Sequence, residues 1–81
     1  MTSPEEFAEQ FDKIGYTLKR YKRNSYYDYA ITKPVENYID PICNIMKNRD
    51  TNNYEVFFQG YINDIKFLEL LVKFLKSLMT I

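Results

Sequence analysis

The sequence predicts an α+β fold, in which an antiparallel β-sheet of three or four strands carries the N- and C-terminal helices on one face as a small two-layer sandwich. Apolar residues recur at helical spacing near both ends of the chain. The segments between them are rich in tyrosine and isoleucine and are separated by turn-forming residues. A chain of 81 residues has room for one hydrophobic core, so we expect residues 1–81 to form a single α+β domain.

The first element is predicted to be a helix over residues 4–14. The run Ser3–Glu6 supplies a capping serine, a proline suited to the first helical position and a glutamate that completes a capping box. Gly15 suits the left-handed position that often follows a helix end. An apolar stripe runs along the predicted helix through Phe7, Phe11 and Ile14.

A β-hairpin is predicted next, with strands over residues 16–23 and 26–32 joined by a turn at Asn24-Ser25. Side chains alternate between the two faces of a strand. The first face of this hairpin is then expected to carry Leu18, Tyr27, Tyr29 and Ile31. The opposite face is expected to carry Lys19, Tyr21, Arg23, Tyr26 and Asp28.

Two structures are open for residues 33–53, which Pro34 and Pro41 interrupt. A helix would place Val35, Tyr38, Ile39 and Ile42 at helical spacing. A short strand over residues 42–47, followed by a polar loop over residues 48–53, is the alternative. We favour the strand, because its apolar residues run directly into six turn-forming ones.

A further strand is predicted over residues 54–62, with Val56 and Phe58 on one face and Phe57 and Tyr61 on the other. Asn63 or Asp64 then caps a helix that runs to about Met79.

Composition argues against catalysis, cofactors and metals. Without histidine, neither a Ser-His-Asp nor a Cys-His catalytic unit can be built. One cysteine cannot close a disulfide within the chain and falls short of the usual zinc ligand set. The two glycines do not form a Walker loop or a dinucleotide fingerprint. We therefore expect no enzymatic activity, no cofactor and no metal site, and we expect Cys43 to be a small buried apolar residue.

The chain is expected in the cytoplasm. Its first ten residues are acidic and lack the basic segment and apolar run of a signal peptide. A small domain stabilised by apolar burial rather than disulfides also suits a reducing compartment.

The tyrosine-rich hairpin is the first candidate for partner binding. Residues 1–12 carry four acidic and no basic side chains, whereas residues 13–23 carry five basic and no acidic ones, interleaved with tyrosines. Such a face can bind a protein, since tyrosine and arginine are enriched at binding hot spots. It can also bind single-stranded nucleic acid through residues 16–32, by ring stacking and phosphate contacts. The candidate partner-binding residues are Lys19, Tyr21, Arg23, Tyr26 and Phe57.

The C-terminal helix is the second candidate surface, because it is apolar around most of its circumference. Either the N-terminal helix covers its second flank through Phe7 and Phe11, or the surplus meets a second copy, another protein or a membrane surface. Charged residues interrupt the segment, so it is not expected to span a membrane. The candidate residues for a homodimer interface are Phe67, Leu71, Phe74 and Leu78.

The compact style of the chain, rich in tyrosine, asparagine, lysine and isoleucine, resembles that of small accessory proteins of phages and mobile elements in AT-rich bacteria. Some of those proteins, anti-CRISPR proteins among them, inhibit host defence proteins. The resemblance is one of class and assigns no residues. It implies a non-enzymatic binding protein that masks or bridges a partner protein.

Overall fold

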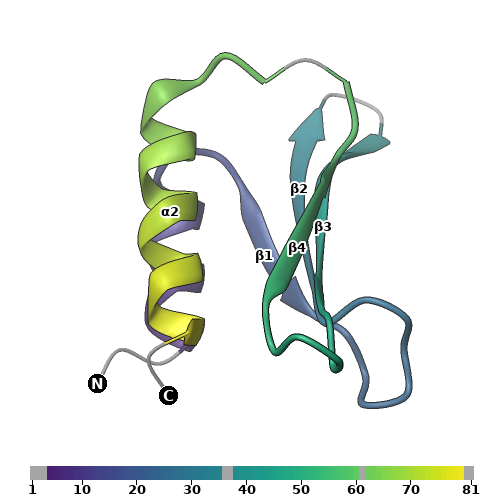
Figure 1. Ribbon diagram of the computed structural model, residues 1–81. Helices are drawn as coiled ribbons and strands as arrows, with labels where there is room; N and C mark the ends of the chain where they lie inside the picture. The colour runs from purple at the N-terminus through teal and green to yellow at the C-terminus, as the bar shows by residue number, and fades with distance from the viewer. Residues whose placement is uncertain (1–3, 36–37, 61, 80–81) are drawn as a thin grey trace.

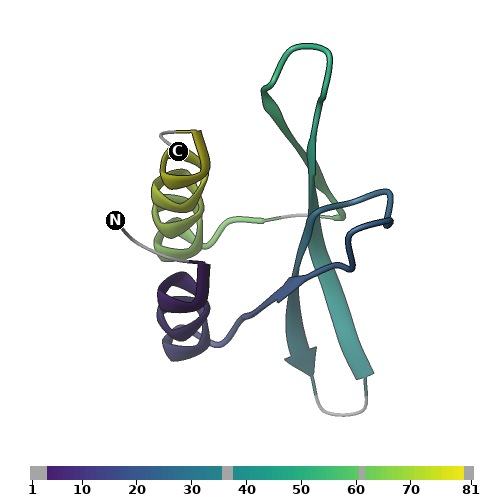
Figure 2. The ribbon, with the colours of Figure 1, turned by 90° about the horizontal axis from the view of Figure 1, so that it is seen from below.

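A computed structural model describes residues 4–35, 38–60 and 62–79 of the chain. The elements follow in the order α1 (Pro4–Lys13), β1 (Thr17–Arg20), β2 (Tyr29–Val35), β3 (Tyr38–Lys47), β4 (Tyr54–Phe58) and α2 (Ile65–Met79). All strand pairs are antiparallel, and the sheet order is β1-β2-β3-β4. Both helices lie side by side on one face of the sheet (Figures 1 and 2). The predicted α+β two-layer arrangement is confirmed.

Helix α1 ends before Gly15, as the sequence predicts, although its last residue is Lys13 rather than Ile14. Gly15 adopts the left-handed conformation with φ 91°. Its N–H donates to the carbonyl of Asp12 at 3.1 Å, and the N–H of Tyr16 donates to the carbonyl of Phe11 at 2.9 Å. This pair of bonds is a Schellman motif, which satisfies carbonyls at the helix end. The predicted capping residue Ser3 lies outside the described residues.

The first hairpin is shorter than predicted, because β1 ends at Arg20 and β2 begins at Tyr29. The register pairs Leu18 with Ile31 and Lys19 with Ala30. The turn is closed by the Ser25 N–H, which donates to the carbonyl of Lys22 at 2.9 Å. The turn therefore lies slightly before the predicted Asn24-Ser25 position, and residues 21–28 form the connection.

The middle segment is a strand rather than a helix, and β3 is longer than the predicted strand over residues 42–47. A register shift between Ile31 and Thr32 marks a bulge in its pairing with β2. The predicted polar loop over residues 48–53 is confirmed. The Asn48 side-chain oxygen accepts the N–H groups of Asp50 and Thr51, and Asn52 has a positive φ of 63°.

Strand β4 ends at Phe58, four residues before the predicted end. The predicted alternation holds within it, since Phe58 pairs with Cys43 and Phe57 with Asn44 in neighbouring rows. The predicted position of Tyr61 lies outside the described residues.

The core lies between the sheet and the two helices. Its most deeply buried side chains are Phe11, Ile31, Cys43, Ile45, Phe67 and Phe74. Helix α1 covers a flank of α2, with the rings of Phe7 and Phe74 in an edge-to-face contact at 5.2 Å between centroids. The prediction that Cys43 is a buried apolar residue is confirmed.

The predicted oligomer-interface residues need a correction. Phe67, Leu71, Phe74 and Leu78 are the buried residues of α2 and belong to the core of the single chain. A second copy cannot reach them without opening the fold. The apolar surplus that α2 exposes consists of Ile65, Val72 and Met79 instead.

Candidate functional site

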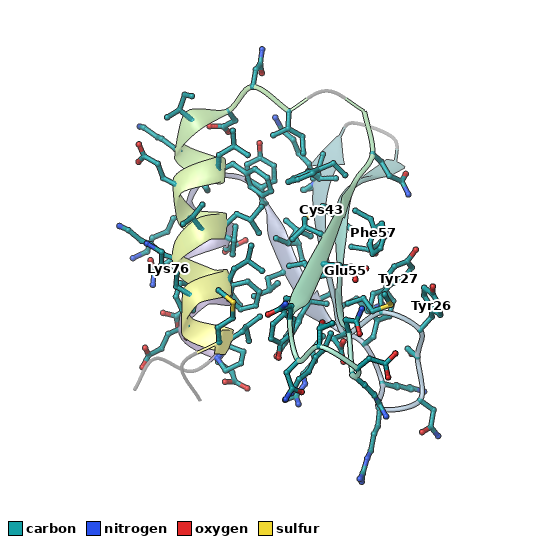
Figure 3. The ribbon with its side chains drawn as sticks, viewed as in Figure 1. Tyr26, Tyr27, Cys43, Glu55, Phe57 and Lys76 are labelled. Atoms are coloured by element: carbon teal, nitrogen blue, oxygen red, sulfur yellow. The ribbon has the colours of Figure 1, made fainter. Side chains whose placement is uncertain are left out.

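Four aromatic side chains gather on the face of the sheet opposite the helices: Tyr21, Tyr26, Tyr27 and Phe57, which we term the outer aromatic patch. Tyr27 is at its centre, with ring centroids 5.0 Å from Tyr26, 5.9 Å from Phe57 and 6.3 Å from Tyr21. Figure 3 shows Tyr26, Tyr27 and Phe57 on this helix-free side of the sheet. The exposed fractions are 73% for Tyr26 and 41% for Phe57, so both present apolar surface to solvent.

The patch is fixed from beneath by the sheet. The Tyr21 hydroxyl donates a hydrogen bond to the Asn44 side-chain oxygen at 3.1 Å. Asn44 pairs with Phe57 on one side and with Ala30 on the other, so all three share one row of the outer face. Ala30 is buried although the helices lie on the other face. The rings of the patch therefore shield the sheet as well as presenting a surface.

The structure brings together three of the five candidate partner-binding residues, and it adds Tyr27, which the sequence did not single out. Tyr21, Tyr26 and Phe57 belong to the patch, and Lys19 occupies the same row as Ala30 on the outer face. Tyr27 was assigned to the inner face by alternation. It lies instead in the irregular connection between β1 and β2, where the pleat no longer dictates the direction of a side chain. Its adjacency to Tyr26 was the signal that both rings could serve one cluster.

Arg23 lies apart from the patch, in an open pocket at the end of the sheet that has a volume of about 540 Å³. We call this the arginine pocket. Figure 1 shows that the β1–β2 and β3–β4 connections both lie at this end of the sheet. Arg20 contributes from the end of β1, Lys22 and Arg23 from the first connection and Arg49 from the second. Tyr21 lines the pocket and also belongs to the patch, so the two features are contiguous.

The carboxylate that lines the arginine pocket, that of Asp28, accepts a backbone hydrogen bond. Its Oδ2 accepts the N–H of Lys47 at 2.7 Å, and its own N–H donates to the carbonyl of Ile45 at 2.8 Å. These bonds hold the connection of residues 21–28 against β3. Arg20 also acts on the pocket tyrosines: burial raises the pKa of Tyr29 and of Tyr54, and the Arg20 charge opposes both shifts.

Other reactive groups of the described residues are held in forms that suit structure rather than chemistry. Burial raises the pKa of the Cys43 thiol to about 12, so it is protonated at neutral pH. Burial also raises the pKa of Tyr16 to about 12, aided by its hydrogen bond to Asp64.

Comparisons with models of protein families, with curated proteins and with solved structures found no match for this chain. Among the described residues, none of the helices has both the length and the apolar character needed to cross a membrane.

Proposed function

We propose that this chain is a non-enzymatic binding protein that docks a partner protein on its outer aromatic patch and so masks or bridges that protein's surface. The observation that carries the proposal is the exposure of Tyr26 and Phe57, at 73% and 41%, on the helix-free face of the sheet. Clustered, exposed apolar side chains mark interaction sites, and rigid aromatic rings are frequent binding hot spots. Tyr21 and Asn44 beneath them provide the rigid support that such anchors need.

The packing of the rings favours a protein surface over stacked bases. Tyr26 meets Tyr27 at an interplanar angle of 87°, and Tyr27 meets Phe57 at 63°. Base stacking needs ring faces that are open and roughly parallel to the bases. Here the central ring of Tyr27 is occupied by its neighbours, which leaves a contoured apolar surface suited to side chains of a partner.

The proposal includes a biological setting. We infer that the chain acts in the cytoplasm as an accessory protein of a phage or mobile element that inhibits a host protein, in the manner of anti-CRISPR proteins. The composition of the chain supports this class, and a buried, reduced Cys43 suits a reducing compartment.

Affinity capture with matched variants tests the proposal. The chain, the variant Tyr26→Ala/Phe57→Ala and the control Ile65→Ala/Val72→Ala would each be used as bait in lysate of the native host. The control removes exposed apolar side chains from α2 instead of from the patch. We expect one protein to be retained by the chain and by the control and lost from the patch variant. If every retained protein binds the patch variant equally well, the proposal is wrong.

Single-stranded nucleic-acid binding through residues 16–32 is the second candidate. The observation that favours it is the position of the exposed Tyr26 ring close in sequence to Lys22 and Arg23, which line the adjacent arginine pocket. An electrophoretic shift with single-stranded DNA or RNA, weakening steeply as salt rises, would support it. Absence of a shift at micromolar protein would remove it.

A further inference from the structure

All three arginines of the chain line one pocket, although they are far apart in sequence. Arg20 ends β1, Arg23 lies in the following connection and Arg49 belongs to the loop after β3. Lys22 adds a fourth cation, against the single carboxylate of Asp28. Within the part of the chain that the structure describes, none of these four cations forms an ion pair with a carboxylate.

An unpaired cluster of this kind favours a bound anion. Four like charges around one pocket repel one another, and an anion between them converts that repulsion into attraction. Guanidinium groups bind planar oxyanions through two parallel hydrogen bonds, which lysine cannot reproduce. Tyr21, Tyr29 and Tyr54 line the same pocket beside these cations. The Tyr21 hydroxyl donates to Asn44, so the pocket cations are the groups that we assign to ligand binding.

We propose that the arginine pocket binds an acidic segment of the partner protein, whose aspartate or glutamate carboxylates pair with Arg23 and Arg49. This inference rests on the proposed function and names the chemistry of the partner. Tyr21 belongs to both the pocket and the outer aromatic patch, so one partner can fill both. The partner would place apolar side chains on Tyr26 and Phe57 and its carboxylates beside them in the pocket.

The distribution of charge favours an acidic peptide over a nucleic acid. A nucleic-acid strand needs a track of cations along its path. The four cations of the pocket lie together at the end of the sheet, where one short acidic segment can meet them. On the outer face beyond the pocket, Lys19 is accompanied by the acidic Glu55, which lies one row from Phe57 and accepts a hydrogen bond from Asn48. The chain has no net charge, so it lacks the long-range attraction typical of nucleic-acid-binding domains.

Nuclear magnetic resonance of the arginine side chains tests the inference on the isolated chain. The three Nε–Hε groups give three signals, which would be followed during titration with an octaglutamate peptide. We expect the signals of Arg23 and Arg49 to shift, and the affinity to fall as salt is raised from about 50 to about 300 mM. An octaglutamine peptide should cause no shift.

Matched variants assign the effect to the pocket. Arg23→Gln/Arg49→Gln should weaken octaglutamate binding about tenfold or more. Lys13→Gln/Lys73→Gln removes the same charge from exposed positions of the two helices and should leave the affinity within about twofold. Arg23→Lys/Arg49→Lys keeps the charge but loses the paired hydrogen bonds. Its affinity for octaglutamate should lie between those of the other two variants. Circular dichroism would verify that each variant is folded.

Three outcomes of these titrations would overturn the inference. Tighter binding of an oligothymidylate of equal charge, with the same Arg23 and Arg49 signals shifting, would identify a phosphate site instead. If the two double glutamine variants weaken octaglutamate binding equally, the peptide is attracted by charge without a defined site. If no arginine signal shifts, the pocket does not bind carboxylates. Each of these outcomes is independent of the capture experiment, in which Tyr26 and Phe57 alone are changed.

Discussion

The hydroxyl of Tyr16 donates a hydrogen bond of 2.9 Å to Oδ2 of Asp64, which joins the end of α1 to the beginning of α2. The other carboxylate oxygen of Asp64 accepts the N–H of Phe67 and so caps α2. The ring of Tyr16 lies 4.5 Å from that of Phe67, and the Lys33 ammonium group lies 5.5 Å from the Tyr16 ring centroid. One residue pair therefore fixes the cap, the helix and the core together.

Alkaline pH should weaken this junction. The pKa of Tyr16 is raised from 10.0 to about 12, chiefly by burial, so its contribution to stability is complete below pH 10 and is lost as pH rises through about 12. Tyr16→Phe should cost about 1 kcal/mol at pH 7 through loss of the hydrogen bond. The difference in unfolding free energy between the chain and Tyr16→Phe, measured with urea, should shrink between pH 10 and 12. A difference that stays constant over this range would contradict the assignment.

Acid should weaken the same junction through Asp64. The hydrogen bond from Tyr16 and the N–H of Phe67 lower its pKa below the usual 3.8, so this stabilisation is complete above that value and lost as pH falls through the folded-state pKa. Asp64→Asn keeps a capping oxygen and should destabilise the chain less than Asp64→Ala at pH 7. Thermal unfolding of both variants from pH 7 down to about pH 2 should show their midpoints converging with that of the unchanged chain. If the unfolding midpoints of the variants and of the unchanged chain keep a constant difference over this pH range, Asp64 does not have this role.

Phe74 should be among the most costly core residues to truncate. Its ring contacts those of Phe7, Phe11 and Tyr29 and is fully buried. Phe74→Ala should destabilise the chain by about 3–5 kcal/mol, which can unfold a domain of this size. Val72→Ala, on the exposed side of the same helix, should change stability by about 0.5 kcal/mol or less. Equal effects in urea unfolding would contradict the packing described.

Self-association through α2 stays a prediction, on a different face from the one first expected. Ile65, Val72 and Met79 are exposed at intervals of seven residues, and the partly buried Leu68 and Leu75 complete a heptad seam. If two copies pair their α2 helices antiparallel about Val72, Glu69 of each lies beside Lys76 of the other. We expect a dimer in sedimentation equilibrium at high concentration, weakened by Glu69→Lys and restored by Glu69→Lys/Lys76→Glu. A monomer at every concentration would exclude this dimer.

Cys43 should be unreactive while the chain is folded. It is 1% exposed, and its thiol pKa is about 12. Because only the thiolate is nucleophilic, an aromatic disulfide reagent at pH 8 should label it slowly, with a rate that rises steeply across the urea unfolding transition. Fast labelling of the folded chain would show that the sheet and helices separate locally.

The elements that sequence predicted well are those fixed by local chemistry. The end of α1 follows from Gly15 and the start of α2 from Asp64, since both act within one helical turn. The polar loop is set by Asn48, whose side chain bonds backbone groups two and three residues later. The fold class follows from these boundaries and from the alternation in the strands.

The features that sequence missed depend on contacts between distant segments. An apolar helix such as α2 does not reveal which flank the sheet and α1 will bury, so the sequence left open whether the interface candidates Phe67 and Phe74 would be covered by α1. The arginine pocket needs β1 and the loop after β3 at the same end of the sheet, and no spacing in the sequence relates Arg20 to Arg49. The outward position of Tyr27 was not predicted, because the alternation of side chains does not extend into the connection between β1 and β2.

The alternation of the sheet also separates the side chains that fold the chain from those proposed to bind. Ile31, Cys43 and Ile45 face the helices, whereas Phe57 of β4 faces outward. Tyr26 joins Phe57 on that side from the connection between β1 and β2, and both contribute little to the core. The outward set can therefore drift or be randomised with small losses of stability. A chain built in this way can follow an evolving target by changing its outer residues alone, and the same division makes it a practical scaffold for selecting new binders.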